Sequence, residues 1–159
     1  MTDDANEPLT EDLPPLQRWI SVELVKFDVP DLKRLTKAAG FDLIVEADAL
    51  GLAVYDLDRQ PVLWVDAITA AEPTREDFEE EMEEFRARID RGGPQIIVRV
   101  LDRARTIVAL SAFSQVSPQA AEALATAVGE QVKRCGDAVR HVVGEGFFGP
   151  DGALLVSES

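Results

Sequence analysis

A chain of 159 residues, of which 46% are apolar and 29% charged, is long enough to form one domain with a buried core. Its net charge of −14 argues against direct binding to nucleic acid or to an anionic membrane, because both require a positively charged surface. No apolar run reaches the roughly 20 residues that cross a bilayer, and the N-terminal residues lack the pattern of a signal peptide. The single cysteine, Cys135, excludes an internal disulfide framework, so we expect a cytoplasmic protein.

The chain divides into a short acidic segment and a longer, patterned region. Residues 1–15 are rich in carboxylates and prolines and almost without apolar side chains, which predicts a flexible acidic tail. Residues 16–159 are expected to form a single α+β domain. In residues 19–27, apolar and polar side chains alternate with the period of a half-buried strand. Pro30 and Gly40 then mark the two ends of a short helix.

Three strands are expected after this helix, at residues 41–47, 50–57 and 62–67. The tight connection at residues 58–61 predicts that the second and third strands form a hairpin. Their apolar residues are nearly continuous. We therefore expect this hairpin to be covered on both faces or to lie in a subunit interface.

The clearest helix in the chain follows a capping position at Thr74. Its apolar residues recur at helical spacing and are Phe78, Met82, Phe85 and Ile89. Residues 92–94, Gly-Gly-Pro, are expected to end it. A second hairpin is then predicted from strands at residues 96–101 and 106–113, joined by a turn at residues 102–105.

The last third of the chain contains one more helix and two strands. A serine followed by a proline at residues 117–118 is a strong helix start, and Gly136 ends that helix. Strands are expected at residues 138–143 and 153–156, separated by a turn at residues 149–152. The apolar face of the helix is formed by Leu124, Val128, Val132 and Cys135.

The expected order of elements is β-α-β-β-β-α-β-β-α-β-β, an α+β fold with three helices and a mainly antiparallel sheet. Between residues 30 and 135 this order, α-β-β-β-α-β-β-α, resembles that of the type III secretion chaperones. The resemblance rests on element order, chain size and acidity. It implies a small, acidic, homodimeric protein that binds another protein without catalysing a reaction.

His141 is the only histidine, and histidine side chains suit general base catalysis because they titrate near neutrality. A base also needs a nucleophile and an orienting acid, which the neighbouring sequence does not supply. Cys135 ends a helix, where the dipole disfavours a thiolate, so both residues are expected to be structural. The alternative is a small enzyme or ligand-binding domain with a site around His141. The residues that could join His141 there are Arg103, Arg105, Glu23 and Glu145.

No cofactor or metal is expected. One histidine and one cysteine cannot build a zinc site within one chain. Asp56 and Asp58 begin a calcium-loop pattern, but Gln60 and Pro61 follow where the turn glycine and later ligands belong, which favours a hairpin turn. The nucleotide-binding patterns GxGxxG and Walker A and the hydrolase pattern GxSxG do not occur.

Residues 76–84 place seven carboxylates in nine positions of one predicted helix. Like charges at i,i+4 repel, at a cost of a few tenths of a kcal/mol per pair. A solvated outer face tolerates this repulsion, whereas a basic protein partner would relieve it. A third interpretation is that the helix imitates a nucleic-acid backbone. The candidate contact residues are Glu79, Glu80 and Glu83.

Two further groups of residues are candidates for binding. Arg103 and Arg105, in the predicted turn, can hold an anion by bidentate contacts or can pair with neighbouring acids. Four large apolar side chains either complete the core or form an exposed interface patch. They are Trp19, Trp64, Phe147 and Phe148.

The sequence favours a non-catalytic, adaptor-like or chaperone-like protein-binding module. The reasons are the absence of a catalytic constellation and the surplus of apolar residues on the predicted strands. We expect a homodimer formed through a sheet face or edge, and a second protein, basic in character, as the partner. Neither nucleic acid nor a membrane is expected to bind directly.

Overall fold

The computed structural model describes residues 17–48, 51–89, 93–112 and 118–157. The acidic segment at residues 1–15, the capping serine at position 117 and part of the Gly-Gly-Pro stop at residues 92–94 lie outside the described residues. None of the helices in the described ranges is long and apolar enough to cross a membrane.

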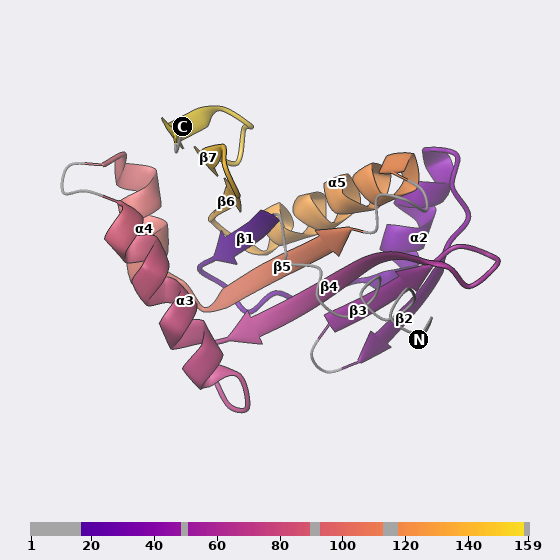
Figure 1. The fold of residues 1–159 in the computed structure, drawn as a ribbon, viewed down its shortest axis with the longest axis horizontal. Helices are drawn as coiled ribbons and strands as arrows, with labels where there is room; N and C mark the ends of the chain where they lie inside the picture. The colour runs from indigo at the N-terminus through magenta and orange to yellow at the C-terminus, as the bar shows by residue number, and fades with distance from the viewer. Residues whose placement is uncertain (1–16, 49–50, 90–92, 113–117, 158–159) are drawn as a thin grey trace, which may run out of the picture.

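The described residues form an α+β fold with one antiparallel sheet and helices packed against it, which confirms the predicted class (Figure 1). The strands are β1 (Gln17–Ser21), β2 (Ile44–Asp48), β3 (Gly51–Tyr55), β4 (Pro61–Thr69), β5 (Thr106–Ala112), β6 (Ala138–Val142), β7 (Gly146–Phe148) and β8 (Leu154–Ser157). The helices are α2 (Val29–Ala38), α3 (Arg75–Arg88), α4 (Gln95–Arg103) and α5 (Pro118–Cys135). Along the sheet the strand order is β2-β3-β4-β5-β1-β6-β7-β8.

Strand β1 lies in the middle of the sheet and pairs with two strands that follow it much later in the chain. It is antiparallel to β5 on one side and to β6 on the other. Arg18, for example, is opposite Ala109 of β5 and His141 of β6. The β2–β5 and β6–β8 parts of the sheet are therefore joined through β1.

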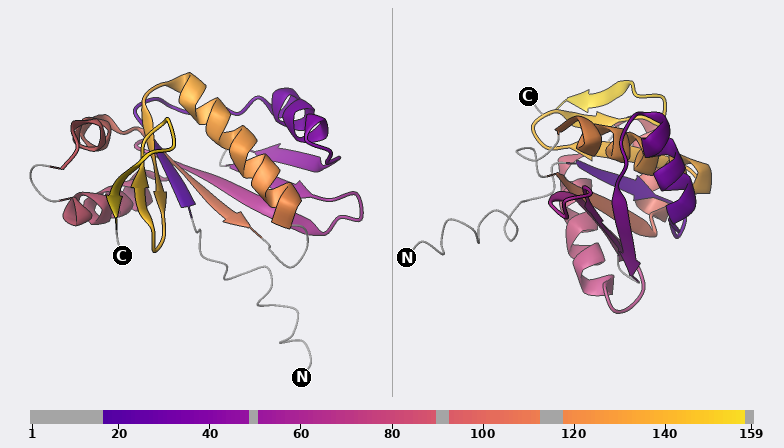
Figure 2. Two further views of the ribbon diagram at one scale, coloured as in Figure 1. Left: turned by 90° about the horizontal axis from the view of Figure 1, so that it is seen from above. Right: turned by 90° about the vertical axis from the view of Figure 1, so that its right-hand side faces the viewer.

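The two faces of the sheet carry separate hydrophobic cores. Helices α2 and α5 cover one face, where Leu32 and Leu124 pack against Trp19, Val65 and other strand residues. Helices α3 and α4 cover the other face near β1, β5 and β6, where Phe85 packs with strand side chains. Figure 2 shows the two helix pairs on opposite sides of the sheet.

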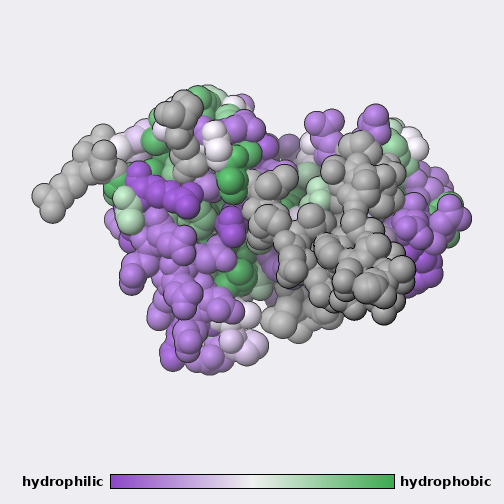
Figure 3. Space-filling view, viewed as in Figure 1, coloured by the Kyte–Doolittle hydropathy of each residue, from purple (hydrophilic) through white to green (hydrophobic). Residues whose placement is uncertain are grey.

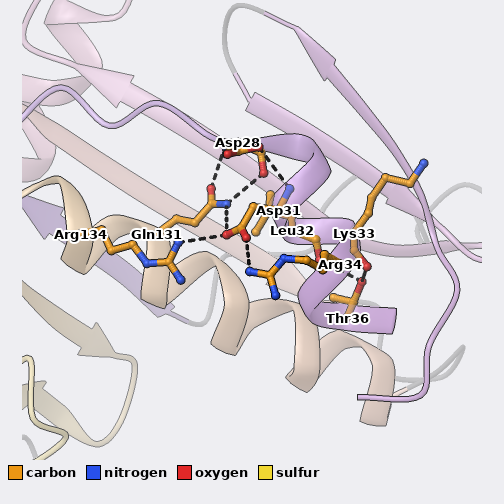
Figure 4. A network of polar contacts seen from close by, with 8 residues as sticks. All are labelled: Asp28, Asp31, Leu32, Lys33, Arg34, Thr36, Gln131 and Arg134. Atoms are coloured by element: carbon orange, nitrogen blue, oxygen red, sulfur yellow. Dashed lines mark hydrogen bonds and ion pairs between the residues drawn. The ribbon is translucent and has the colours of Figure 1, made fainter. Parts of the chain in front are cut away.

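Helix α2 is fixed to α5 by a polar cluster that begins at its N-cap (Figure 4). The Asp28 side chain accepts a hydrogen bond from the Asp31 N–H at 3.1 Å, and a proline lies in the first turn, as predicted. The Gln131 side chain of α5 accepts from the Asp28 N–H at 2.9 Å and donates to the Asp28 carbonyl at 2.9 Å and to Asp31 Oδ2 at 3.2 Å. Asp31 also pairs with Arg34 and Arg134. The N-terminus of α2 is therefore held from both helices.

The predicted strand at residues 96–101 is wrong, because this segment is helix α4. Its buried residues are Ile97, Val100 and Leu101, which have the i, i+3, i+4 spacing of one helix face, whereas Val98 is 40% exposed. Pro94 is the N-cap of the helix, and its carbonyl accepts hydrogen bonds from the N–H groups of Ile97 and Val98. A run of β-branched residues fits either structure locally, and packing on the sheet decides between them.

Because residues 95–103 are helical, the number of helices and the order of elements differ from those predicted. The described residues contain four helices, where the sequence predicted three. Between residues 30 and 135 the observed order is α-β-β-β-α-α-β-α, so it differs at one element from the order expected for the chaperones. Arg103 and Arg105 consequently lie at the end of a helix and before β5, and the hairpin turn predicted for them does not exist.

The other predicted boundaries are close to those observed. Strand β1 is shorter than the predicted strand, and Phe147 and Phe148 lie in a short strand, β7, where the sequence indicated a turn-rich segment. The hairpin between β3 and β4 is confirmed, with Asp56 Oδ1 accepting from the N–H groups of Asp58 and Gln60 at 2.9 Å each. The turn at residues 149–152 is also present.

Candidate functional site

The candidate site is a groove of about 700 Å³ between α3 and the β8 side of the sheet, which we call the α3 groove. It brings together residues of one helix, three strands and the turn after β6. Its lining residues are Arg18, Glu80, Glu81, Glu84, Phe85, Arg88, Val143, Phe147, Val156 and Ser157.

Helix α3 supplies the acidic wall of this groove. It buries Phe78, Met82 and Phe85 against the sheet, as the helical spacing predicted, and leaves all of its carboxylates except that of Glu81 exposed. The surface over α3 is strongly hydrophilic in Figure 3. Glu80 is exposed and lines the groove, as does Glu84, which belongs to the acidic run but was not among the candidate contact residues.

Glu79 and Glu83, the other two candidate contact residues of α3, are exposed but are not among the residues that line the groove. They follow the same helix at the same four-residue spacing as Glu80 and Glu84. The helix therefore has two pairs of exposed glutamates that differ mainly in their position relative to the groove.

An ion pair between Arg18 and Glu81 forms the floor of the groove. Arg18 Nε lies 2.8 Å from Glu81 Oε1, and the two side chains are only 20% and 26% exposed. Burial raises the pKa of the Glu81 carboxyl, the charge of Arg18 opposes this rise, and the charges of Glu84 and Asp77 add to it. The floor thus holds a carboxylate whose burial is only partly compensated.

His141 is 1% exposed and contacts residues that line the groove. Its ring packs against Phe85 and Phe147, with centroid separations of 5.2 and 4.7 Å. Arg88 Nη1 lies 3.1 Å from His141 Nε2. A guanidinium can only donate, so this contact requires Nε2 to be the acceptor. The lone pair that a general base would use at this nitrogen is directed at Arg88.

Of the residues that could have joined His141 in a catalytic site, Arg105 lies well away from it. Arg105 adjoins the Ser21 end of β1, where its backbone N–H donates to the Ser21 carbonyl at 2.8 Å. His141 pairs with Arg18, which is three residues before Ser21 on β1. At 3.3 Å per residue, these two positions of β1 are about 10 Å apart. Glu145 is exposed in the turn after β6.

Arg103 and Arg105 are both exposed. The backbone of Arg105 is fixed by two hydrogen bonds: its N–H donates to the Ser21 carbonyl, and its carbonyl accepts from the Ala70 N–H at 3.0 Å. Anion binding by these two arginines stays a prediction.

The four large apolar candidates divide into two groups. Trp19 is 6% exposed and Phe147 is fully buried, so both are core residues, the first under α5 and the second under α3. Trp64 and Phe148 are half-buried. The ring of Trp64 packs edge-on against Tyr55 with centroids 5.5 Å apart.

One feature of the site had no clear signal in the sequence: strand β8 forms an edge of the sheet beside the groove. The sheet ends at β8, which pairs with β7 on its inner side. Leu154 of β8 is 53% exposed, and Val143, in the turn between β6 and β7, is 51% exposed. An edge strand with apolar residues next to it is a template on which another chain can pair.

Comparison with protein-family models, with curated proteins and with solved structures gives no match for this chain. Within the described ranges, no three histidine, cysteine, aspartate or glutamate side chains converge as metal ligands.

Proposed function

We propose that this protein is a protein-binding module that takes up a basic, extended segment of a partner protein in the α3 groove. The observation that carries the proposal is the position of an apolar edge strand, β8, beside the acidic helix α3 in one groove. The first feature suits an added strand and the second suits basic side chains. Together they favour one kind of occupant.

The register of the sheet indicates where the side chains of such a segment would lie. Val156 of β8 pairs with Phe147, which pairs with His141, and these residues share the face that α3 covers. Successive side chains of a strand point to opposite faces, so every second side chain of a segment paired with β8 would face α3. Lysines or arginines at those positions would approach Glu80 and Glu84, which line the same groove as Val156.

The electrostatics of α3 support a cationic occupant. Glu80 and Glu84 are like charges at i,i+4, and they lie next to Glu81, whose carboxyl pKa is raised by burial. A cation placed in the groove would reduce the repulsion along the helix. It would also offset the cost of keeping Glu81 ionised. This is the relief expected of a basic partner.

The test uses a fluorescein-labelled peptide in which lysine and valine alternate, with a peptide of alternating glutamate and valine as the control ligand. Binding is measured by fluorescence anisotropy. The wild-type protein is expected to bind the lysine peptide and not the glutamate peptide. Affinity should fall as salt rises from about 50 to about 200 mM, because the contacts are partly exposed to solvent.

Two charge-reversal variants on the same helix locate the binding site. Glu80→Lys with Glu84→Lys should weaken peptide binding by about tenfold or more, equivalent to at least about 1.4 kcal/mol. Glu79→Lys with Glu83→Lys makes the same change in net charge outside the groove and should have a much smaller effect. Equal losses in the two variants would show that only net charge matters, and the proposal would be wrong. So would failure of the wild type to bind the lysine peptide.

We further propose that the protein is a homodimer, as in the chaperone-like interpretation, formed through the face of β3 and β4 that carries Tyr55 and Trp64. What supports this is a half-buried aromatic pair beside an exposed ion pair, Arg59 with Glu46, in which N and O are 2.8 Å apart. Opposite charges beside an apolar patch can exchange partners across a twofold axis. The cytoplasmic location expected from composition stays a prediction.

Light scattering tests the dimer. The wild type should be dimeric at about 100 μM, and Trp64→Ser should shift it to monomer. Leu57→Ser, in the exposed turn before β4, is the matched control and should leave the dimer intact, since Leu57 is 63% exposed and lies outside the aromatic pair. A monomeric wild type would contradict this part of the proposal.

A further inference from the structure

A second cavity, of about 500 Å³, lies on the opposite face of the sheet from the α3 groove, between α5 and the strands. Its opening is bordered by the turn at residues 149–152. Its apolar lining consists mainly of Trp19, Leu63, Leu110, Ala121, Ala125 and Gly129. The volume lies within the range of about 300–1,000 Å³ that is typical of small-molecule sites.

The cavity exists because α5 presents small residues to the sheet. Ala121, Ala125 and Gly129 recur every four residues and so follow one face of the helix. At Gly129 the helix lies against Trp19 so closely that an added Cβ would be 2.9 Å from Trp19 Cζ2. The two alanines leave the adjoining space open. Larger side chains at these positions would fill it, as they do elsewhere in the core.

One cation of this cavity has no acidic partner in the described part of the chain. Arg140 of β6 lies between the rings of Trp19 and Phe148, with its guanidinium carbon 5.9 and 4.9 Å from their centroids. Its hydrogen-bond partner is the neutral side chain of Gln17, at 3.5 Å. In a chain with a net charge of −14, a half-buried arginine with aromatic and amide neighbours is available to an added anion.

The remaining rim residues limit how much negative charge the ligand can carry. Lys133 pairs with Glu130 at 2.9 Å and donates to the Pro150 carbonyl at 3.3 Å, which links α5 to the turn. Asp151 and Glu122 also border the cavity, and Asp151 Oδ1 accepts from the Ala153 N–H. These carboxylates would repel a ligand with several negative charges. A single charge that reaches Arg140 is compatible with them.

We propose that this cavity binds a small amphiphilic carboxylic acid. The apolar body of the ligand lies against Trp19, Leu63 and Leu110 beneath the small residues of α5. Its carboxylate accepts hydrogen bonds from Arg140. The site is separate from the α3 groove and does not depend on the partner proposed there.

Three ligands with the same chain and different charges test the proposal by isothermal titration calorimetry at pH 7: octanoate, octanol and octylamine. Octanoate is expected to bind at least about tenfold more tightly than octanol, because a charge-assisted hydrogen bond adds to the same apolar contact. Octylamine should bind most weakly. This order runs against the net negative charge of the protein, so nonspecific attraction cannot produce it.

Four variants assign the effect to the cavity. Arg140→Gln should weaken octanoate by about tenfold and leave octanol unchanged, and Arg140→Lys should recover part of the loss. Arg134→Gln makes the same charge change at an exposed residue of α5, paired with Asp31, and should have no effect. Ala125→Leu fills the cavity and should abolish binding of all three ligands.

Either of two results would overturn the proposal. One is that octanol binds the wild type as tightly as octanoate, or that neither binds. The other is that Arg140→Gln and Arg134→Gln have equal effects on octanoate. If circular dichroism shows that Arg140→Gln does not fold, the comparison of the three ligands on the wild-type protein decides the matter.

Discussion

Gln131 is predicted to be the polar residue of α5 that contributes most to stability, and the substitution Gln131→Ala tests this. The side chain is 4% exposed and makes three hydrogen bonds to the start of α2 (Figure 4). At about 1 kcal/mol net for each bond, their loss should lower the free energy of unfolding by about 2–3 kcal/mol. The loss should be about 2 kcal/mol if water forms a hydrogen bond with the Asp28 N–H in the variant. The Asp28 carbonyl stays paired in either case, because it also accepts a hydrogen bond from the Leu32 N–H at 3.0 Å.

The assay is urea unfolding followed by tryptophan fluorescence and circular dichroism, together with thermal unfolding. For a chain of this size the loss corresponds to a fall in Tm of roughly 5–10 °C. Arg134→Ala is the control, because its ion pair with Asp31 is on the same helix end but the arginine side chain is 57% exposed. Exposed pairs contribute little, so this variant should be close to the wild type.

Gln131→Leu separates the hydrogen bonds from the packing of the side chain. It keeps most of the volume and removes all three bonds, so the loss should persist. A Gln131→Leu protein as stable as the wild type would refute the reasoning, because stability would then depend on packing alone. A Gln131→Ala loss no larger than that of Arg134→Ala would refute it as well.

Two further predictions concern the same fold. The pKa of Asp31 is lowered from 3.8 to about 2, chiefly by the hydrogen bond from Arg34 and then by that from Gln131, so its ionised form stabilises the folded state. The difference in unfolding free energy between the wild type and Asp31→Asn should therefore be full above about pH 4 and disappear as the pH falls to about 2. Urea unfolding midpoints measured at a series of acidic pH values test this. A difference that does not change with pH would contradict the prediction. Val100→Ala should lower the free energy of unfolding in urea by about 2 kcal/mol, because Val100 is fully buried in α4. Val98→Ala should lower it by less than about 0.5 kcal/mol. Similar losses in the two variants would indicate a strand instead of a helix.

The elements that the sequence predicted well are those whose signals are local. Phe78, Met82 and Phe85 alone define the buried face of α3, and the side chain of Asp56 closes the β3–β4 hairpin within a few residues. In both cases the residues that fix the structure are neighbours in the chain. Local spacing is therefore enough to identify the element.

The sequence of helix α4 was mispredicted as a strand, because its apolar residues fit both the helical and the strand period. These residues are Ile96, Ile97, Val98 and Val100. What selects the helix is the surface on which it packs, formed by β1 and β6, and those strands come from distant parts of the chain. The strands that pair with β1 could not be predicted for the same reason. No local feature near Trp19 indicates that β5 lies on one side and β6 on the other.

The candidate site was only partly predictable. The carboxylates of α3 stand out in the sequence, and Glu80 is indeed in the groove. Arg18 gives no signal, because its importance comes from Glu81, which folding alone brings to within 2.8 Å. The position of β8 at the sheet edge also gives no signal in the sequence, because it depends on how all the strands are ordered in the folded sheet. For Phe147 the sequence left core packing and surface exposure open, and the structure shows a core residue under α3.

The central position of β1 has a consequence for how the protein is made. The meander of β2 to β5 can pair as soon as residue 112 has left the ribosome, with β1 added at its side. The other side of β1 must then wait, its main-chain groups open to water, until β6 has been synthesised. Such long-range pairing is slow, and a half-built sheet with an open strand invites aggregation. We therefore expect nascent chains that stall between α5 and β6 to be the form most dependent on molecular chaperones.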